Sequence, residues 1–88
     1  MARTIGTVKI PRNISGLDLV KALGVFGYLV TRQSGSHIRL SRQINDTQQH
    51  LTIPAHKPLR VGTLRQILKD VSSQIGIDLQ KLIEMLVD

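Results

Sequence analysis

The sequence predicts an α+β domain in which helices cover one face of a three-stranded antiparallel sheet. Three observations predict this class. Apolar residues recur at helical spacing before residue 27 and after residue 62. Between these segments, three short stretches rich in β-forming residues alternate apolar and polar side chains. Only short turn sequences separate the stretches, so we expect neighbouring strands to run antiparallel as a meander.

The first helix is expected to begin at Ser15 and to end at Gly27. The hydroxyl of Ser15 and the carboxylate of Asp18 have the spacing of a capping box. Gly27 suits the left-handed residue that ends many helices. The apolar side chains that recur at helical spacing are Leu19, Val20, Leu23 and Phe26.

The three strands are expected at residues 28–33, 36–43 and 48–53. Ser34-Gly35 and Asn45-Asp46 are turn sequences between them, and Pro54 ends the last strand. The alternation predicts a buried face with Ile38, Leu40, Leu51 and Ile53. It predicts an opposite face, open to solvent, with His37, Arg39, His50 and Thr52.

Two more helices are expected after a loop at residues 55–62. Thr63 to Gln66 has the pattern of a capping box and predicts a helix that begins at Thr63. Gly76 breaks this helix, and Asp78 caps a last short one. The predicted order is therefore α-β-β-β-α-α, with the helices on one face of the sheet.

Charge is distributed unevenly along the chain. The net charge is +6, and the sequence pI is near 10.6. Residues 1–69 hold eleven Lys or Arg and only two acids, whereas residues 70–88 hold one Lys and four acids. A domain this basic is expected to bind a polyanion, with nucleic acid favoured over a merely solvated basic surface. We expect residues 1–14 to form a flexible basic arm before one domain at residues 15–88.

His37 is the main candidate for chemistry, because it follows a glycine turn at the start of a strand. Imidazole transfers protons near neutral pH. A ribonuclease without a metal needs such a group for the ribose 2′-hydroxyl, and it needs positive charge near the phosphate. Arg32, Arg39 and Arg42 are the candidates for that charge. The alternative from the residues alone is a surface histidine at a hairpin.

A second basic set surrounds the start of the helix after residue 62. It comprises Lys57, Arg60, Arg65 and Lys69. Free N–H groups at a helix N-terminus bind phosphate, so this set is a candidate RNA contact. The alternative is one solvated helix face. Ser36 either contacts phosphate or forms a hydrogen bond within the turn.

No metal, cofactor or membrane partner is expected. The three histidines lack the spacing of a zinc site, and no phosphate-binding glycine loop is present. The chain has no cysteine, which excludes disulfides and thiol catalysis and suits a reducing cytoplasm. No stretch is long and apolar enough to indicate a membrane span.

Four segments in a fixed order carry a family resemblance. They are Gly27-Tyr28, Gln33-Ser34-Gly35-Ser36-His37, Pro54-Ala55-His56 and the run from Gly62 to Lys69. Together they resemble the HicA-type toxins of HicAB toxin–antitoxin systems, also called the YcfA-like family. The resemblance covers nearly the whole chain, roughly residues 12–83. It implies a fold like that of double-stranded-RNA-binding domains, α-β-β-β-α.

The resemblance also implies an activity and a partner. Members of this family are ribosome-independent mRNA interferases, endoribonucleases whose catalytic histidine is that of the Gly-Ser-His motif, here His37. A HicB-type antitoxin is then the expected protein partner, and mRNA is the expected substrate. Two alternatives stay open: an RNA-binding module of the same fold that does not cut, and a domain whose charge recognises only an acidic antitoxin.

Overall fold

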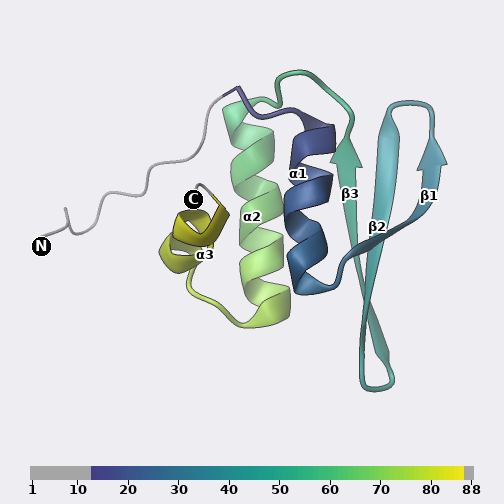
Figure 1. Ribbon diagram of the computed structural model, residues 1–88, viewed down its shortest axis with the longest axis vertical. Coiled ribbons are helices and arrows are strands. Elements are labelled where there is room, and N and C mark those ends of the chain that lie inside the picture. Colours follow the sequence, from purple (N-terminus) through teal and green to yellow (C-terminus); the bar gives the residue numbers. More distant parts are fainter. Residues whose placement is uncertain (1–12, 87–88) are drawn as a thin grey trace, which may run out of the picture.

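The computed structural model describes residues 13–86. Three helices, one short 3₁₀ helix and three strands follow one another: α1 (Gly16–Leu23), η1 (Gly24–Phe26), β1 (Leu29–Ser34), β2 (His37–Ile44), β3 (Thr47–Pro54), α2 (Val61–Ile75) and α3 (Leu79–Leu86). The strands form one antiparallel sheet in the order β1-β2-β3 (Figure 1). The predicted α+β class and the arrangement of double-stranded-RNA-binding domains are confirmed. The arm predicted at residues 1–14 lies almost wholly outside the described residues.

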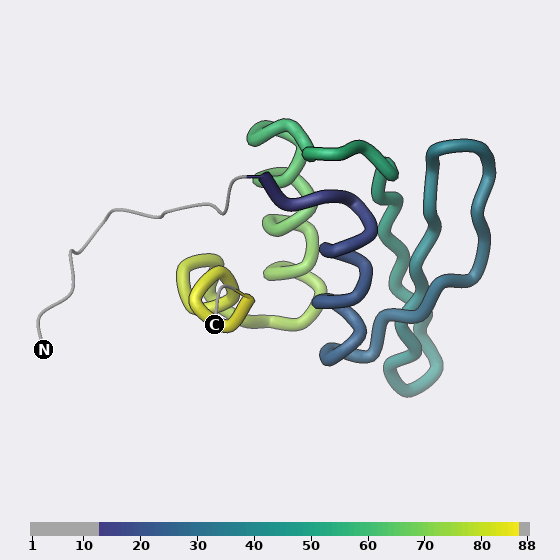
Figure 2. Tube along the Cα trace, turned by 45° about the horizontal axis from the view of Figure 1, so that its top comes forward, coloured from purple at the N-terminus to yellow at the C-terminus, as the bar shows by residue number. Residues whose placement is uncertain are grey.

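Helices cover only part of the sheet. Helices α1 and α2 pack near β3, and β1 is the strand farthest from both (Figure 1). Helix α3 packs on α2, on the side away from the sheet (Figure 2). All six residues of β1 are exposed. One face of the sheet, called the open face from here on, therefore carries no helix.

The core is aliphatic and includes one aromatic ring, that of Tyr28. Its sheet residues are those that the alternation placed inside: Ile38, Leu40, Leu51 and Ile53. The residues between them, His37, Arg39, His50 and Thr52, are exposed as predicted. Ile14, the last residue of the predicted arm, packs against this core, and its carbonyl accepts a hydrogen bond from the Leu59 amide at 2.8 Å.

Helix α1 begins with the predicted capping box. The Asp18 amide donates to the Ser15 hydroxyl at 3.0 Å, and the Ser15 amide donates to the Asp18 carboxylate at 3.5 Å. The α-helix ends at Leu23, earlier than expected, and continues as η1. Gly27 then takes the left-handed conformation, with φ +94°. The predicted conformation of Gly27 is confirmed, although it ends a 3₁₀ turn.

The predicted start of α2 is wrong. The helix begins at Val61 with Arg60 as N-cap, and no side chain caps it, so Thr63 lies inside the first turn. Leu59 and Leu64 flank this start, and both are buried. They occupy the positions of a hydrophobic staple, which fixes how the chain enters a helix by burying apolar side chains. Burial of Leu59 therefore sets the start of α2 in place of a capping box.

The end of α2 and the start of α3 follow the prediction. Gly76 is left-handed, with φ +73°, and its amide donates to the Ser72 carbonyl at 2.9 Å. The Asp78 carboxylate accepts from the amides of Gln80 and Lys81 at 3.1 and 3.3 Å. Both signals are local, which is why the sequence alone predicts them.

Candidate nucleic-acid interface

His37 is held at the first position of β2. Gly35 has φ +58°, and glycine adopts such a backbone without a steric penalty, so the two-residue turn places His37 directly after it. In the sheet, His37 lies between Ser34 of β1 and Pro54 of β3. Its neighbour Ile38 points into the core. The His37 side chain therefore projects from the open face of a rigid element.

Two arginines share this face with His37. Arg39 lies directly opposite Arg32 in the pairing of β1 with β2. Like charges placed opposite each other in a sheet repel, and both side chains are exposed. No ion pair to either side chain is found within residues 13–86. This uncompensated positive charge favours an anion beside His37.

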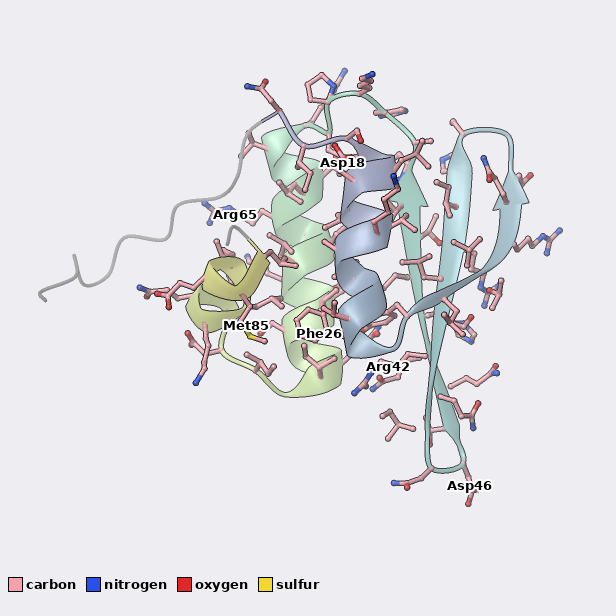
Figure 3. All side chains as sticks on the ribbon, viewed as in Figure 1. Asp18, Phe26, Arg42, Asp46, Arg65 and Met85 are labelled. Carbon is pink, nitrogen blue, oxygen red and sulfur yellow. The ribbon has the colours of Figure 1, made fainter. Side chains whose placement is uncertain are left out.

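Arg42, the third candidate for this positive charge, lies apart from Arg32 and Arg39. Its guanidinium donates to the Phe26 carbonyl at 2.8 Å and to the Gln49 side-chain oxygen at 2.6 Å. Figure 3 shows Arg42 near Phe26, below the end of α1. The reason is the strand period, because position 42 has the same phase as Ile38 and Leu40.

The β1–β2 turn meets the loop that follows β3. The Ala55 amide donates to the Ser36 carbonyl at 2.6 Å, and the Gly16 amide donates to the His56 carbonyl at 2.9 Å. The turn, the loop and the N-termini of α1 and α2 therefore lie at one end of the molecule (Figure 1). Lys57 and Arg60 are exposed in that loop and at its end. Ser36, His37, Lys57 and Arg60 thus lie at the same end.

Arg65 and Lys69 lie on a different surface. The buried stripe of α2 faces the core and consists of Leu64, Ile67, Leu68 and Val71. Figure 3 shows Arg65 on the side of α2 that is turned away from the sheet. Lys69 is one helical turn further and is also exposed. The basic residues expected to act together are therefore divided between two surfaces.

Three side chains on the open face are linked by hydrogen bonds that were not predicted from the sequence. The Ser41 hydroxyl lies 2.8 Å from Nδ1 of His50 and 3.0 Å from the Thr31 hydroxyl. Ser41 and His50 lie on this face because they are next to the buried residues Leu40 and Leu51 in their strands. Thr31 reaches Ser41 at an irregularity in β1, where the register shifts between Val30 and Arg32. No feature of the sequence indicated that bulge.

The three histidines are not gathered into one group. His50 pairs with Ser41, which lies further along β2 than His37 does. Residues 13–86 contain no cluster of three His, Cys, Asp or Glu side chains that could hold a metal ion. Asp46, a carboxylate that could bind a metal ion, lies in the β2–β3 turn, at the opposite end of β2 from His37 (Figure 3).

Comparison with known proteins identifies the family. The family model described as "HicA toxin of bacterial toxin-antitoxin" matches residues 16–72. The chain belongs to the HicA toxin family. No curated protein and no solved structure matches it.

The region of this HicA family member that matches the family model includes the candidate site. It runs from the first residue of α1 to Ser72 in α2, so it includes the open face, the loop after β3 and the basic positions of α2. It does not include α3. Family membership makes the chain a toxin of a toxin–antitoxin pair, which implies an antitoxin as partner. Within residues 13–86, no helix has the length and hydropathy needed to cross a bilayer.

Proposed function

We propose that this HicA family member is an endoribonuclease that cleaves mRNA without a metal ion, with His37 as general acid or base. The observation that carries the proposal is the placement of His37 at the rigid start of β2. It shares the open face with Arg39 and Arg32, which lack an ion-pair partner among the described residues. The substrate follows from the chemistry, because only RNA supplies a 2′-hydroxyl.

The proposed reaction is an internal attack at phosphorus. As base, His37 takes the proton of the 2′-hydroxyl while the 2′-oxygen forms a bond to phosphorus. The bond from phosphorus to the 5′-oxygen of the next nucleotide breaks, and that oxygen takes a proton from water or from another acid. The products are a 2′,3′-cyclic phosphate and a 5′-hydroxyl. Arg39 and Arg32 stabilise the negative charge on the pentacoordinate phosphorus.

Further contacts and the partner belong to the same proposal. Ser36, Lys57 and Arg60 lie at the end of the molecule that holds His37, and we assign them to phosphates that flank the scissile one. A HicB-type antitoxin is the proposed partner, with an acidic surface that covers the open face. We place the toxin in the cytoplasm, where mRNA is available.

His37→Ala tests the assignment directly. We expect the variant to lose at least about 100-fold in cleavage of a defined transcript, because general acid–base catalysis contributes about 10²–10⁴-fold. His56→Ala is the matched control, because His56 holds Gly16 through its backbone carbonyl and its side chain is exposed. This control is expected to cleave like the wild type, and EDTA is expected to have no effect.

A second function has its own support. Arg65 and Lys69 are exposed one helical turn apart on α2, and Arg65 points away from the sheet that carries His37, so this pair suits RNA binding without cleavage. If purified wild type binds RNA with strong salt dependence and yields no cleavage product, the RNA-binding module is the correct function. If His37→Ala cleaves at the wild-type rate, His37 is not the catalytic group.

A further inference from the structure

The open face is organised as three rows that run across the sheet. The first row holds Ser34, His37 and Pro54, and the second holds Arg32, Arg39 and Thr52. The third row holds Leu29, Ser41 and His50. Alternate residues on a strand are about 6–7 Å apart, so the first and third rows are about 13 Å apart. His50 therefore does not reach a phosphate that His37 contacts.

The third row holds an imidazole in a fixed orientation. Thr31 donates to the carbonyl oxygen of Arg39 at 3.4 Å, and this oxygen can only accept. The Ser41 hydroxyl lies between the Thr31 hydroxyl and Nδ1 of His50 and shares a hydrogen bond with each, and the donor in the bond to Nδ1 depends on the tautomer of His50. Nδ1 is the ring nitrogen engaged in this chain, and the His50 side chain is exposed, so Nε2 is left for a ligand. A chain of three exposed side chains contributes little to stability, but it orients the ring in advance.

Leu29 gives the third row an apolar side chain. It is 69% exposed and pairs directly with Ser41. A ring face, an apolar side chain and a hydrogen-bonding nitrogen are what an unstacked nucleobase requires. The bases of an RNA duplex are stacked and paired, so they do not offer their faces to such a surface.

We propose that Leu29, Ser41 and His50 form a base-binding subsite for single-stranded RNA, with Thr31 as a positioning residue. This inference rests on the proposed function, because it takes the strand to run from His37 past the two arginines to the third row. The nucleobase bound there belongs to a nucleotide beyond the nearest neighbour of the scissile phosphate. The rows hold two arginines and no acid, so their charge suits a polyanion better than a neutral peptide.

A double-mutant cycle between protein and RNA tests the subsite. The protein is the full chain with His37→Ala, which is expected to suppress cleavage during the titration. The probes are labelled single-stranded oligonucleotides of about 12 nucleotides, each with one abasic position, and anisotropy gives the affinity. We expect one abasic position to weaken binding about fivefold, since stacking of one base on a side chain has at least this effect. With His50→Ala added, the same abasic position is expected to make no further difference.

Gln48→Ala is the matched control, because Gln48 is exposed on the same face of β3 and lies one row beyond His50. This variant is expected to keep the sensitivity to the abasic position. Ser41→Ala is expected to lose part of it, because the ring of His50 is then no longer held. Circular dichroism and thermal melting check that each variant is folded.

Two results would overturn the subsite. One is an abasic effect that persists unchanged in the His50→Ala variant. The other is a loss of affinity on His50→Ala that is equal for every oligonucleotide, which assigns His50 to the RNA backbone. Failure of the proposed function gives a different result, because wild type would then leave every RNA uncut while the cycle could still be measured.

Discussion

Tyr28 links the sheet to α2 through a single buried ring. Its hydroxyl donates to the side-chain oxygen of Gln74 at 2.7 Å, and the guanidinium of Arg42 lies 5.9 Å from the ring centroid. Burial raises the pKa of the Tyr28 phenol above 10.0. The charge of Arg42 opposes this shift, and that of Asp70 adds to it. The folded protein therefore holds the phenol proton more tightly than the unfolded chain does.

This pKa shift predicts a loss of stability at alkaline pH. The stabilisation of the protonated phenol is fully present below pH 10.0 and is lost as the pH rises through the raised pKa. Urea unfolding between about pH 8 and pH 11 should show a falling free energy of unfolding, with a smaller fall in Tyr28→Phe. Because Tyr28 is the only tyrosine, phenolate absorbance reports its titration directly. A midpoint at or below 10.0 in the folded protein would contradict the shift.

The face of the sheet on which a site residue lies was predictable where strand alternation alone decides it. Strand alternation alone puts His37 and Arg39 on the open face. The same rule, applied consistently, excludes Arg42, because position 42 follows Ile38 and Leu40 in phase. Thr31 was not predictable, since a bulge arises from how two strands pair and not from the residues of one strand.

At the scale of elements, Gly16 determines how closely α1 approaches the sheet. A Cβ atom on Gly16 would lie 2.0 Å from the carbonyl oxygen of Pro54, a backbone atom that cannot move alone. The Gly16 amide also donates to the His56 carbonyl. The first turn of α1 therefore packs directly on the end of β3, beside the row that holds His37.

Gly16→Ala is expected to destabilise the protein by about 2–3 kcal/mol or more, as overpacking of a tight contact does. Gly62→Ala is the matched control, because a Cβ on this residue of α2 meets nothing within 4 Å. It is expected to leave stability unchanged or to raise it by up to about 1 kcal/mol, since alanine has less conformational freedom in the unfolded chain. Chemical denaturation measures both. Equal effects of the two substitutions would show that the contact with Pro54 is unimportant.

The sequence predicted the kind and order of the elements better than their ends. Capping by Ser15 and Asp78 is local and was found correctly. The start of α2 depends on burial of Leu59, which is a property of the assembled core. The capping-box pattern at Thr63 therefore predicted the wrong first residue for this helix. The close approach at Gly16 depends on where β3 ends in space, and nothing in the residues around Gly16 indicates this.

At the scale of the whole molecule, positive charge is divided between two surfaces. Arg32 and Arg39 lie on the open face, whereas Arg65 and Lys69 lie on α2, and Arg65 points away from the sheet. An RNA that contacts both surfaces must pass around the domain. A short RNA on the open face has no reason to touch α2.

Because the basic residues are divided between these two surfaces, substitutions on each surface should affect the binding of short and long RNAs differently. Arg39→Ala should weaken binding of both short and long RNAs and reduce the slope of log affinity against log salt by about 0.7, the value for one phosphate contact on a single strand. The double variant Arg65→Ala/Lys69→Ala should weaken binding of a long transcript only. Titrations at several salt concentrations measure both effects. If the double variant weakens a short oligonucleotide as strongly as Arg39→Ala does, the two surfaces act as one.

The hydrogen bond between Gly16 and His56 also has a consequence for folding kinetics. It closes a loop that contains α1 and the whole sheet, whereas the strands pair through two-residue turns. Hairpins of this kind form in microseconds, and distant contacts form more slowly because the entropy of loop closure opposes them. The meander can therefore form before α1 docks. His37, Arg39 and Arg32 all lie in the β1–β2 hairpin, so a newly made chain can arrange these residues together with its sheet, before the loop that carries Lys57 and Arg60 is fixed against α1.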